Sequence, residues 1–161
     1  MEEEMHILGI RERYGFFKSQ VEQMIDTYKQ ELGKGNEARI RELFAAFDGR
    51  ATLRELHLPR FERVTAGVIE GEEYDVIAWR QGQRVWIAEV KDTATDVSVA
   101  KAFSEKIRTV TRYQIEEKVL ICLAGYDSRV SSLVQAEQIH LWTLEDVNFL
   151  LRLHGKFPIQ V

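Results

Sequence analysis

The sequence predicts an α/β fold in which helices cover a mixed β-sheet. First, the stretch Glu73 to Lys91 holds two apolar runs of strand length on either side of a polar turn. Second, the segments that follow alternate between helix-like and strand-like patterns, and this order is typical of a sheet covered by helices. Third, a long helical stretch precedes them. We therefore expect an N-terminal helix over residues 1–34 and a domain over residues 35–161.

Residues 1 to about 33 predict one uninterrupted helix. No proline interrupts it, and glycines at Gly33 and Gly35 are suited to a helix end. Its apolar side chains recur at alternating steps of three and four residues, as in a heptad stripe: Ile7, Ile10, Tyr14, Phe17, Val21, Met24 and Tyr28, continued by Leu32. Such a stripe has to be covered, either by a second copy of the chain or by the domain that follows. We favour a homodimer through residues 7–28.

A second helix is predicted from Glu37 to Phe47, with Asn36 as its cap. Its apolar side consists of Ile40, Leu43, Phe44 and Phe47. Glu37 falls on this side of the helix, although an acid in the first turn is also favoured by the helix dipole alone.

The hairpin within Glu73–Lys91 carries the candidate site. Its strands, Tyr74–Trp79 and Arg84–Lys91, are rich in Val, Ile, Trp and Tyr and flank the turn Gln81-Gly82-Gln83. If the hairpin is symmetric about Gly82, Asp75 lies directly across from Glu89, with Cβ atoms roughly 4.5–5.5 Å apart. Glu89 and Lys91 then share one face.

Two carboxylates at that separation repel each other unless a proton or a cation lies between them, so the hairpin predicts a metal site. The alternative is an ion pair between Glu89 and Lys91 at the strand end, with Asp75 solvated. A second acid-x-Lys triplet, Glu116-Glu117-Lys118, is interpreted as a solvated segment leading into the next strand.

The remaining elements follow from apolar spacing and turn residues. Residues 48–72 are ambiguous because Pro59 breaks them, and Thr65–Ile69 is the candidate first strand. Asp96 is placed to cap a helix from Val97 to about Tyr113. The sequence then predicts a strand Lys118–Ala124, a helix Arg129–Gln138, a strand Ile139–Thr143 and a closing helix Leu144–His154.

Composition limits the possible functions. The formal net charge of −4 argues against strong non-specific affinity for nucleic acid, although a local basic surface remains compatible with it. The single cysteine, Cys122, lies in an apolar run typical of a buried side chain, and the four histidines show no zinc-ligand spacing. No glycine-rich phosphate-binding pattern occurs, so no small-molecule cofactor is expected. The acidic N-terminus and the lack of long apolar runs predict a cytoplasmic protein without a membrane segment.

The order of elements around Asp75 and the triplet Glu89-Val90-Lys91 resembles the PD-(D/E)XK nuclease superfamily, which includes restriction endonucleases, Holliday-junction resolvases and recombination exonucleases. The stretch EYDVIAWRQGQRVWIAEVKDTATDV, the strand KVLICLA and the segment IHLW look more narrowly like uncharacterised prokaryotic members with a coiled-coil helix in front. The resemblance covers roughly residues 35 to 155. It implies a restriction-endonuclease-like αβββαβ core, with the triplet on the third strand and the preceding acid at the start of the second.

The resemblance also implies roles for individual residues. Asp75, Glu89 and the Val90 carbonyl would bind Mg²⁺ or Mn²⁺, which prefer oxygen ligands. Lys91 would orient the attacking water and offset charge on the phosphate, and Glu37 would bond a metal-bound water. The sequence departs from the family pattern in two places: Tyr74 replaces the motif's proline, and Asp92 adds negative charge beside the lysine.

The favoured function is a metal-dependent nuclease that hydrolyses DNA phosphodiester bonds as a dimer. The basic residues expected to meet the DNA backbone are Lys101, Lys106, Arg108 and Arg112. One alternative is a non-catalytic DNA- or protein-binding module of the same fold, dimerised by its coiled coil. Another is a structural adaptor whose function lies in the long helix.

Overall fold

The computed structural model describes residues 2–33 and 35–160, and it describes side chains within residues 9–28 and 35–160. The chain divides into two compact units, Met1–Gly35 and Asn36–Val161. The first unit contains the single helix α1 (Glu2–Gly33). Several apolar side chains of the predicted stripe are exposed on α1: Ile10, Tyr14, Phe17, Val21 and Met24. The outer stripe residues, Ile7 and Leu32, lie outside the described side chains.

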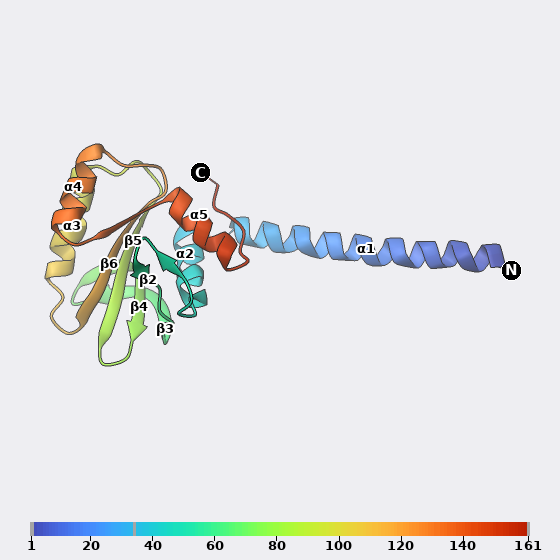
Figure 1. The fold of residues 1–161 in the computed structure, drawn as a ribbon, viewed down its shortest axis with the longest axis horizontal. Helices are drawn as coiled ribbons and strands as arrows, with labels where there is room; N and C mark the ends of the chain where they lie inside the picture. Colours follow the sequence, from blue (N-terminus) through green and yellow to red (C-terminus); the bar gives the residue numbers. More distant parts are fainter. Residues whose placement is uncertain (1, 34, 161) are drawn as a thin grey trace. The chain divides into compact units, whose positions relative to one another are not determined.

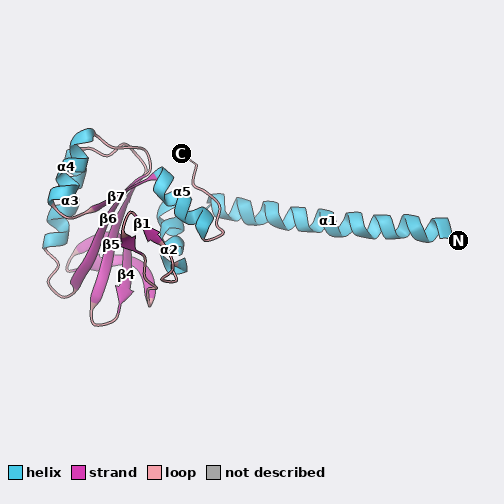
Figure 2. Cartoon of the chain, in the orientation of Figure 1, coloured by secondary structure: helices cyan, strands magenta, loops and turns pink. Residues whose placement is uncertain are grey.

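The second unit is a mixed α/β domain, which confirms the predicted fold class (Figures 1 and 2). Its elements are α2 (Asn36–Ala46), β1 (Thr52–Leu53), β2 (Leu56–His57), β3 (Arg63–Ile69), β4 (Glu72–Arg80), β5 (Arg84–Lys91), α3 (Val97–Arg108), β6 (Gln114–Cys122), α4 (Ser128–Ala136), β7 (His140–Thr143) and α5 (Leu144–Leu153). Apart from the two-stranded β1–β2 hairpin, the run from α2 to β6 has the order αβββαβ that the resemblance implies.

The five-stranded sheet has the order β3-β4-β5-β6-β7. The β3–β4 and β4–β5 pairs are antiparallel, whereas β5–β6 and β6–β7 are parallel and are each connected through a helix. The β4–β5 hairpin is symmetric about Gly82, since Val76 pairs with Ala88 and Arg80 pairs with Arg84. Gly82 adopts φ 71°, a left-handed conformation that glycine accepts without strain. The predicted hairpin and its turn are confirmed.

Helices bury both faces of the sheet (Figure 1). Helices α2 and α5 pack on one face, where Phe44 and Leu150 contribute to the same core as Trp86 and Trp142. Helices α3 and α4 pack on the other face, and the core there includes Phe103, Ile107, Val130 and Leu120. Within β5 the side chains alternate between these cores, as strand geometry requires.

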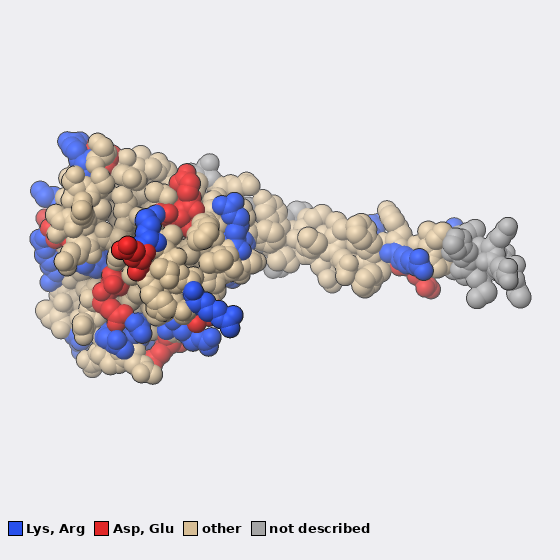
Figure 3. Space-filling view, viewed as in Figure 1, with Lys and Arg blue, Asp and Glu red and all other residues tan. Residues whose placement is uncertain are grey.

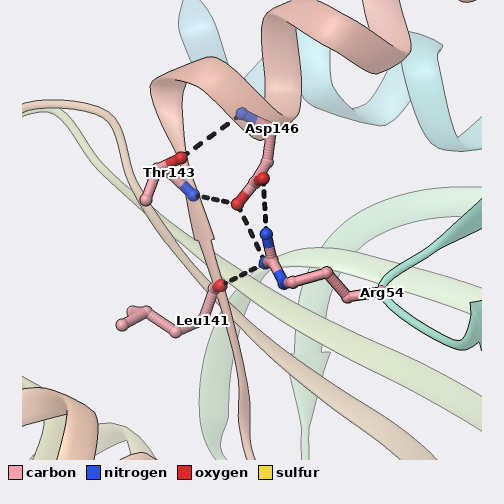
Figure 4. A network of polar contacts seen from close by, with 4 residues as sticks. All are labelled: Arg54, Leu141, Thr143 and Asp146. Atoms are coloured by element: carbon pink, nitrogen blue, oxygen red, sulfur yellow. Dashed lines mark hydrogen bonds and ion pairs between the residues drawn. The ribbon is translucent and has the colours of Figure 1, made fainter.

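The ambiguous segment 48–72 contains the β1–β2 hairpin, which is anchored by one arginine (Figure 4). The Arg54 guanidinium donates to both carboxylate oxygens of Asp146, at 2.6 and 2.9 Å, and to the Leu141 carbonyl at 2.9 Å. Asp146 and Thr143 also form a capping box at the start of α5. One carboxylate thereby joins the β1–β2 hairpin to β7 and α5.

Two predicted boundaries are wrong for reasons of tertiary contact. The helix predicted to reach Tyr113 ends at Arg108, and the backbone N–H groups of Thr111 and Arg112 beyond it donate to the Glu70 carboxylate. The strand predicted to begin at Lys118 begins at Gln114, which pairs with Arg84 of β5. Asp96, in contrast, caps α3 as predicted, since its side chain accepts from the Val99 N–H at 3.0 Å.

Cys122 is buried in β6, as the apolar run predicts. Within the described residues, no helix combines the length and the apolar character that a membrane span requires.

Candidate functional site

A β-bulge lies at Asp75. The β3–β4 register passes from Thr65↔Ile77 to Gly67↔Tyr74, so one residue of β3 faces two residues of β4, Asp75 and Val76. Side-chain alternation breaks at the same point, because Tyr74 packs in the core under α3 whereas Val76 packs in the core under α2. Bulges of this kind redirect side chains and end strand pairing.

The bulge also ends the β4–β5 ladder. The last pair is Val76↔Ala88, and β4 continues toward Glu72 paired only with β3. Asp75 and Glu89 therefore lie one step beyond the ladder and do not form the directly opposed pair that hairpin symmetry predicts. The strands separate at the position of the predicted site.

Where the strands separate, side chains form the hydrogen bonds that main-chain N–H and C=O groups would otherwise lack. Asp75 Oδ2 accepts from the Val90 N–H at 2.9 Å, and Arg41 Nη1 donates to the Asp75 carbonyl at 3.0 Å. The N–H and C=O of one strand residue point to the same edge, so the Val90 carbonyl points toward β4 as well. The next carbonyl, of Lys91, accepts from Leu123 N on the β6 side at 3.0 Å. Asp75 and Val90 thus present oxygen atoms at the same edge of β5.

Glu89 is buried, with 6% of its surface exposed, and each of its oxygens has a lysine partner. Oε1 lies 3.0 Å from Lys106 Nζ, and Oε2 lies 3.4 Å from Lys91 Nζ. The ion pair between Glu89 and Lys91, which the sequence analysis considered as the alternative to a metal site, is therefore present. A second ion pair, with Lys106 of α3, joins it, and spacing along β5 alone does not predict this pair.

Lys106 was predicted to contact DNA, but its ammonium lies at the candidate site. Besides bonding Glu89, it lies over the Tyr74 ring, 4.6 Å from the ring centroid, and the Tyr74 hydroxyl donates to the Lys106 carbonyl at 3.0 Å. The spacing of Val99, Phe103 and Lys106, at i, i+4 and i+7, was the available signal, because it places Lys106 on the inward side of α3.

Further carboxylates lie near Asp75 and Glu89. Glu37 is exposed, so its predicted place on the apolar side of α2 does not bury it. Slight desolvation still raises the pKa of Glu37 above its ordinary value, and the charges of Asp75 and Asp92 raise it further, while Arg41 opposes the shift. Asp92 is also bonded by the side-chain amide of Asn36 at 2.8 Å, so Asn36 does more than begin the helix. The candidate site therefore contains four acidic side chains and three basic ones. The acids are Glu37, Asp75, Glu89 and Asp92, and the bases are Arg41, Lys91 and Lys106.

A groove runs beside Glu89 between β5 and α3, and we call it the β5–α3 groove. It encloses about 180 Å³. Its lining combines the charged residues Glu89, Lys91 and Lys106 with an apolar wall of Val99, Ala102 and Phe103. The two ammoniums therefore border a hollow that is accessible from solvent.

The available donors suit a hard divalent cation. Asp75 and Glu89 supply carboxylate oxygens and Val90 supplies a carbonyl oxygen, the ligand types preferred by Mg²⁺ and Mn²⁺. Within the described residues, no group of three or more His, Cys, Asp or Glu side chains is arranged to hold a metal ion. A site of two carboxylates and one main-chain carbonyl does not require such a group. The pKa of Glu37 is raised first by desolvation and then by the charges of Asp75 and Asp92, and a cation would offset the second effect.

The other basic residues predicted to meet DNA differ in their surroundings. Lys101 and Arg112 are exposed, whereas Arg108 is ion-paired with Glu137 on the surface. Acidic and basic side chains are intermixed over the face of the domain shown in Figure 3.

The second acid-x-Lys triplet is half-buried and its charged groups are hydrogen-bonded, which corrects the interpretation that it is a solvated segment. Glu116 lies within β6 and accepts hydrogen bonds from Arg80, Arg84 and the Trp86 indole. Lys118 Nζ donates to the Glu137 carbonyl at 2.7 Å. The ionic groups of this triplet are held by structural partners.

No protein-family model and no curated protein matches the sequence. Solved structures that resemble part of the chain include a protein of unknown function, AF1548, with a TM-score of 0.47 and 15% identity over 60% of this chain and 56% of that one. They also include a repair endonuclease from Pyrococcus abyssi, with a TM-score of 0.42 and 10% identity over 50% of this chain and 37% of that one. The chain thus spans little more than half of the first structure and about a third of the second. Both TM-scores are below 0.5.

Proposed function

We propose that residues 36–161 form a metal-dependent nuclease domain that hydrolyses DNA phosphodiester bonds. The observation that supports this most is the bulge at Asp75, which ends the β4–β5 ladder and brings the Asp75 carboxylate to the Val90 N–H, between Glu89 and Lys91 in the chain. The resemblance of Asp75 and Glu89-Val90-Lys91 to the PD-(D/E)XK pattern adds to this support. The bulge brings the Asp75 carboxylate to the main chain of the residue that follows Glu89.

In this proposal Asp75, Glu89 and the Val90 carbonyl hold Mg²⁺ or Mn²⁺. When bound, the metal supplies a Lewis acid and lowers the pKa of a coordinated water. Lys91, which borders the groove, stabilises negative charge on the phosphate. Glu37 orients water from the α2 side, and Arg41 positions the Asp75 backbone through its hydrogen bond to the carbonyl.

A second candidate function is a non-catalytic DNA- or protein-binding module. It is favoured by the state of Glu89, both of whose oxygens are already paired with lysines. In that case the charged groups of the site are structural ion pairs.

We further propose that α1 forms a homodimer through residues 7–28. Phe17 is 64% exposed and Met24 is 65% exposed, at heptad positions of one stripe. Phe17→Glu is expected to halve the mass measured by light scattering, because it places a charge in the seam. Unchanged mass with lowered stability would show that the stripe packs on its own domain instead.

Calorimetric titration of the full chain with Mg²⁺ or Mn²⁺ tests the proposed metal site. Metal is expected to raise the melting temperature of the wild type, because a ligand that binds only the folded state stabilises it. Asp75→Asn is expected to remove that response. Its amide oxygen still accepts from the Val90 N–H, so the bulge is retained while the ligand charge is lost.

The same preparations are then assayed with single-stranded, duplex and branched DNA at low salt, where phosphate contacts are strongest. Metal-dependent cleavage by the wild type, lost in Asp75→Asn, is the expected result. A wild type that neither binds metal nor cuts any of these substrates would exclude the nuclease and leave the binding module.

A further inference from the structure

We propose that Lys106 is an internal competitor of the metal: its ammonium occupies the side of Glu89 that a divalent cation needs, and it has to leave before the cation binds. This inference rests on the proposed metal site. It assigns to Lys106 a role in controlling that site, in place of the DNA contact predicted from its charge.

The geometry of Glu89 leads to this inference. The Glu89 side chain is buried, and its two oxygens are divided between two ammoniums, Lys106 at 3.0 Å and Lys91 at 3.4 Å. Mg²⁺ binds carboxylate oxygens at about 2.0–2.1 Å. A divalent ion on Oε1 would therefore lie within roughly 5 Å of an undisplaced Lys106 ammonium, and the two cations would repel each other across a partly desolvated site.

Lys106 makes the shorter contact to Glu89 and is the more buried of the two lysines, yet its ammonium can leave without moving its helix. Its backbone is held independently of its charge, because its carbonyl accepts from the Tyr74 hydroxyl at 3.0 Å. Its ammonium is held by Glu89 and by the face of the Tyr74 ring. The side chain lines the open β5–α3 groove and has a flexible four-carbon stem, so the ammonium can swing outward without moving α3.

Competition predicts the direction in which metal affinity changes when the Lys106 charge is removed. A metal ion that binds Oε1 has to break the contact between Glu89 and Lys106, so removing the ammonium should strengthen metal binding. A supporting role predicts the opposite sign, since loss of a residue that orients Glu89 would weaken metal binding. The two roles are therefore separated by the direction of one measurement.

The test is a calorimetric titration of the full chain with Mn²⁺, comparing the wild type with Lys106→Met. We expect Lys106→Met to bind Mn²⁺ at least ten-fold more tightly and to show a larger metal-induced rise in melting temperature. Lys106→Arg, which retains the charge, is expected to stay near the wild type. Lys101→Met removes an exposed lysine from the same helix and controls for long-range charge, so its affinity is expected to change little.

Lys106→Gln provides a second neutral variant that still donates a hydrogen bond toward Glu89, and it replaces Lys106→Met if the latter does not fold. Equal or weaker Mn²⁺ binding by the neutral variant overturns the competition while leaving the metal site intact. Absence of Mn²⁺ binding in both the wild type and the neutral variant overturns the competition together with the proposed metal site.

Discussion

The pKa of an acidic side chain is shifted in opposite directions at the two ends of the β4–β5 hairpin. Near the turn, Glu116 of the neighbouring strand β6 receives hydrogen bonds from Arg80, Arg84 and Trp86. Burial raises the pKa of Glu116, but the bonds from Trp86 and Arg80 outweigh this effect and leave the pKa below its ordinary value. At the open end, desolvation and neighbouring carboxylates raise the pKa of Glu37.

This difference distinguishes a structural ion cluster from a candidate binding site. Both ends lie close to an acid-x-Lys triplet, so the triplet alone is not informative. At the turn, donors outnumber the single acid that they hold. At the open end, the acids outnumber the cations, and the surplus negative charge favours an additional cation.

The largest effect is expected on DNA cleavage, when the lysines of the two triplets are replaced in turn. Lys91→Ala is expected to reduce metal-dependent DNA cleavage by about 100- to 1,000-fold while metal still binds, because it removes one preorganised donor to the phosphate. Lys118→Ala is the matched control and should retain cleavage, since Lys118 is engaged with the Glu137 carbonyl. Equal losses in the two variants would remove the distinction between the triplets.

A smaller effect concerns the acid at the turn. Glu116→Gln is expected to lower the free energy of unfolding by about 2 kcal/mol at neutral pH, as is typical for loss of hydrogen bonds to a charged group. Because folding lowers the pKa of Glu116, this contribution is complete above the unfolded pKa of about 4.3 and is lost as the pH falls through the folded pKa. Chemical denaturation of both proteins at several pH values measures it. A difference that persists unchanged in acid would assign the effect to packing.

The smallest effect is expected at the open end, and its sign is reversed. Glu37→Gln should leave the stability of the metal-free protein equal or higher, because it removes one of several acids that repel each other. The same denaturation experiment checks this outcome. A clear loss of stability would show that Glu37 has a structural partner comparable to those of Glu116.

The sequence by itself determined the features that depend on local spacing. Strand alternation and the turn at Gly82 fixed the hairpin and its symmetry, and the position of Asp96 fixed the start of α3. These features follow from residues close together in the chain, where side-chain period and capping chemistry act directly.

Only the tertiary structure decided how the site is built. The bulge at Asp75 depends on the register with β3, and this register is set by pairing across the sheet. The contact between Lys106 and Glu89 and the hydrogen bonds from Arg80 and Arg84 to Glu116 join residues on different elements. A one-residue change in register redirects a strand side chain, and sequence spacing within one strand carries no information about that register.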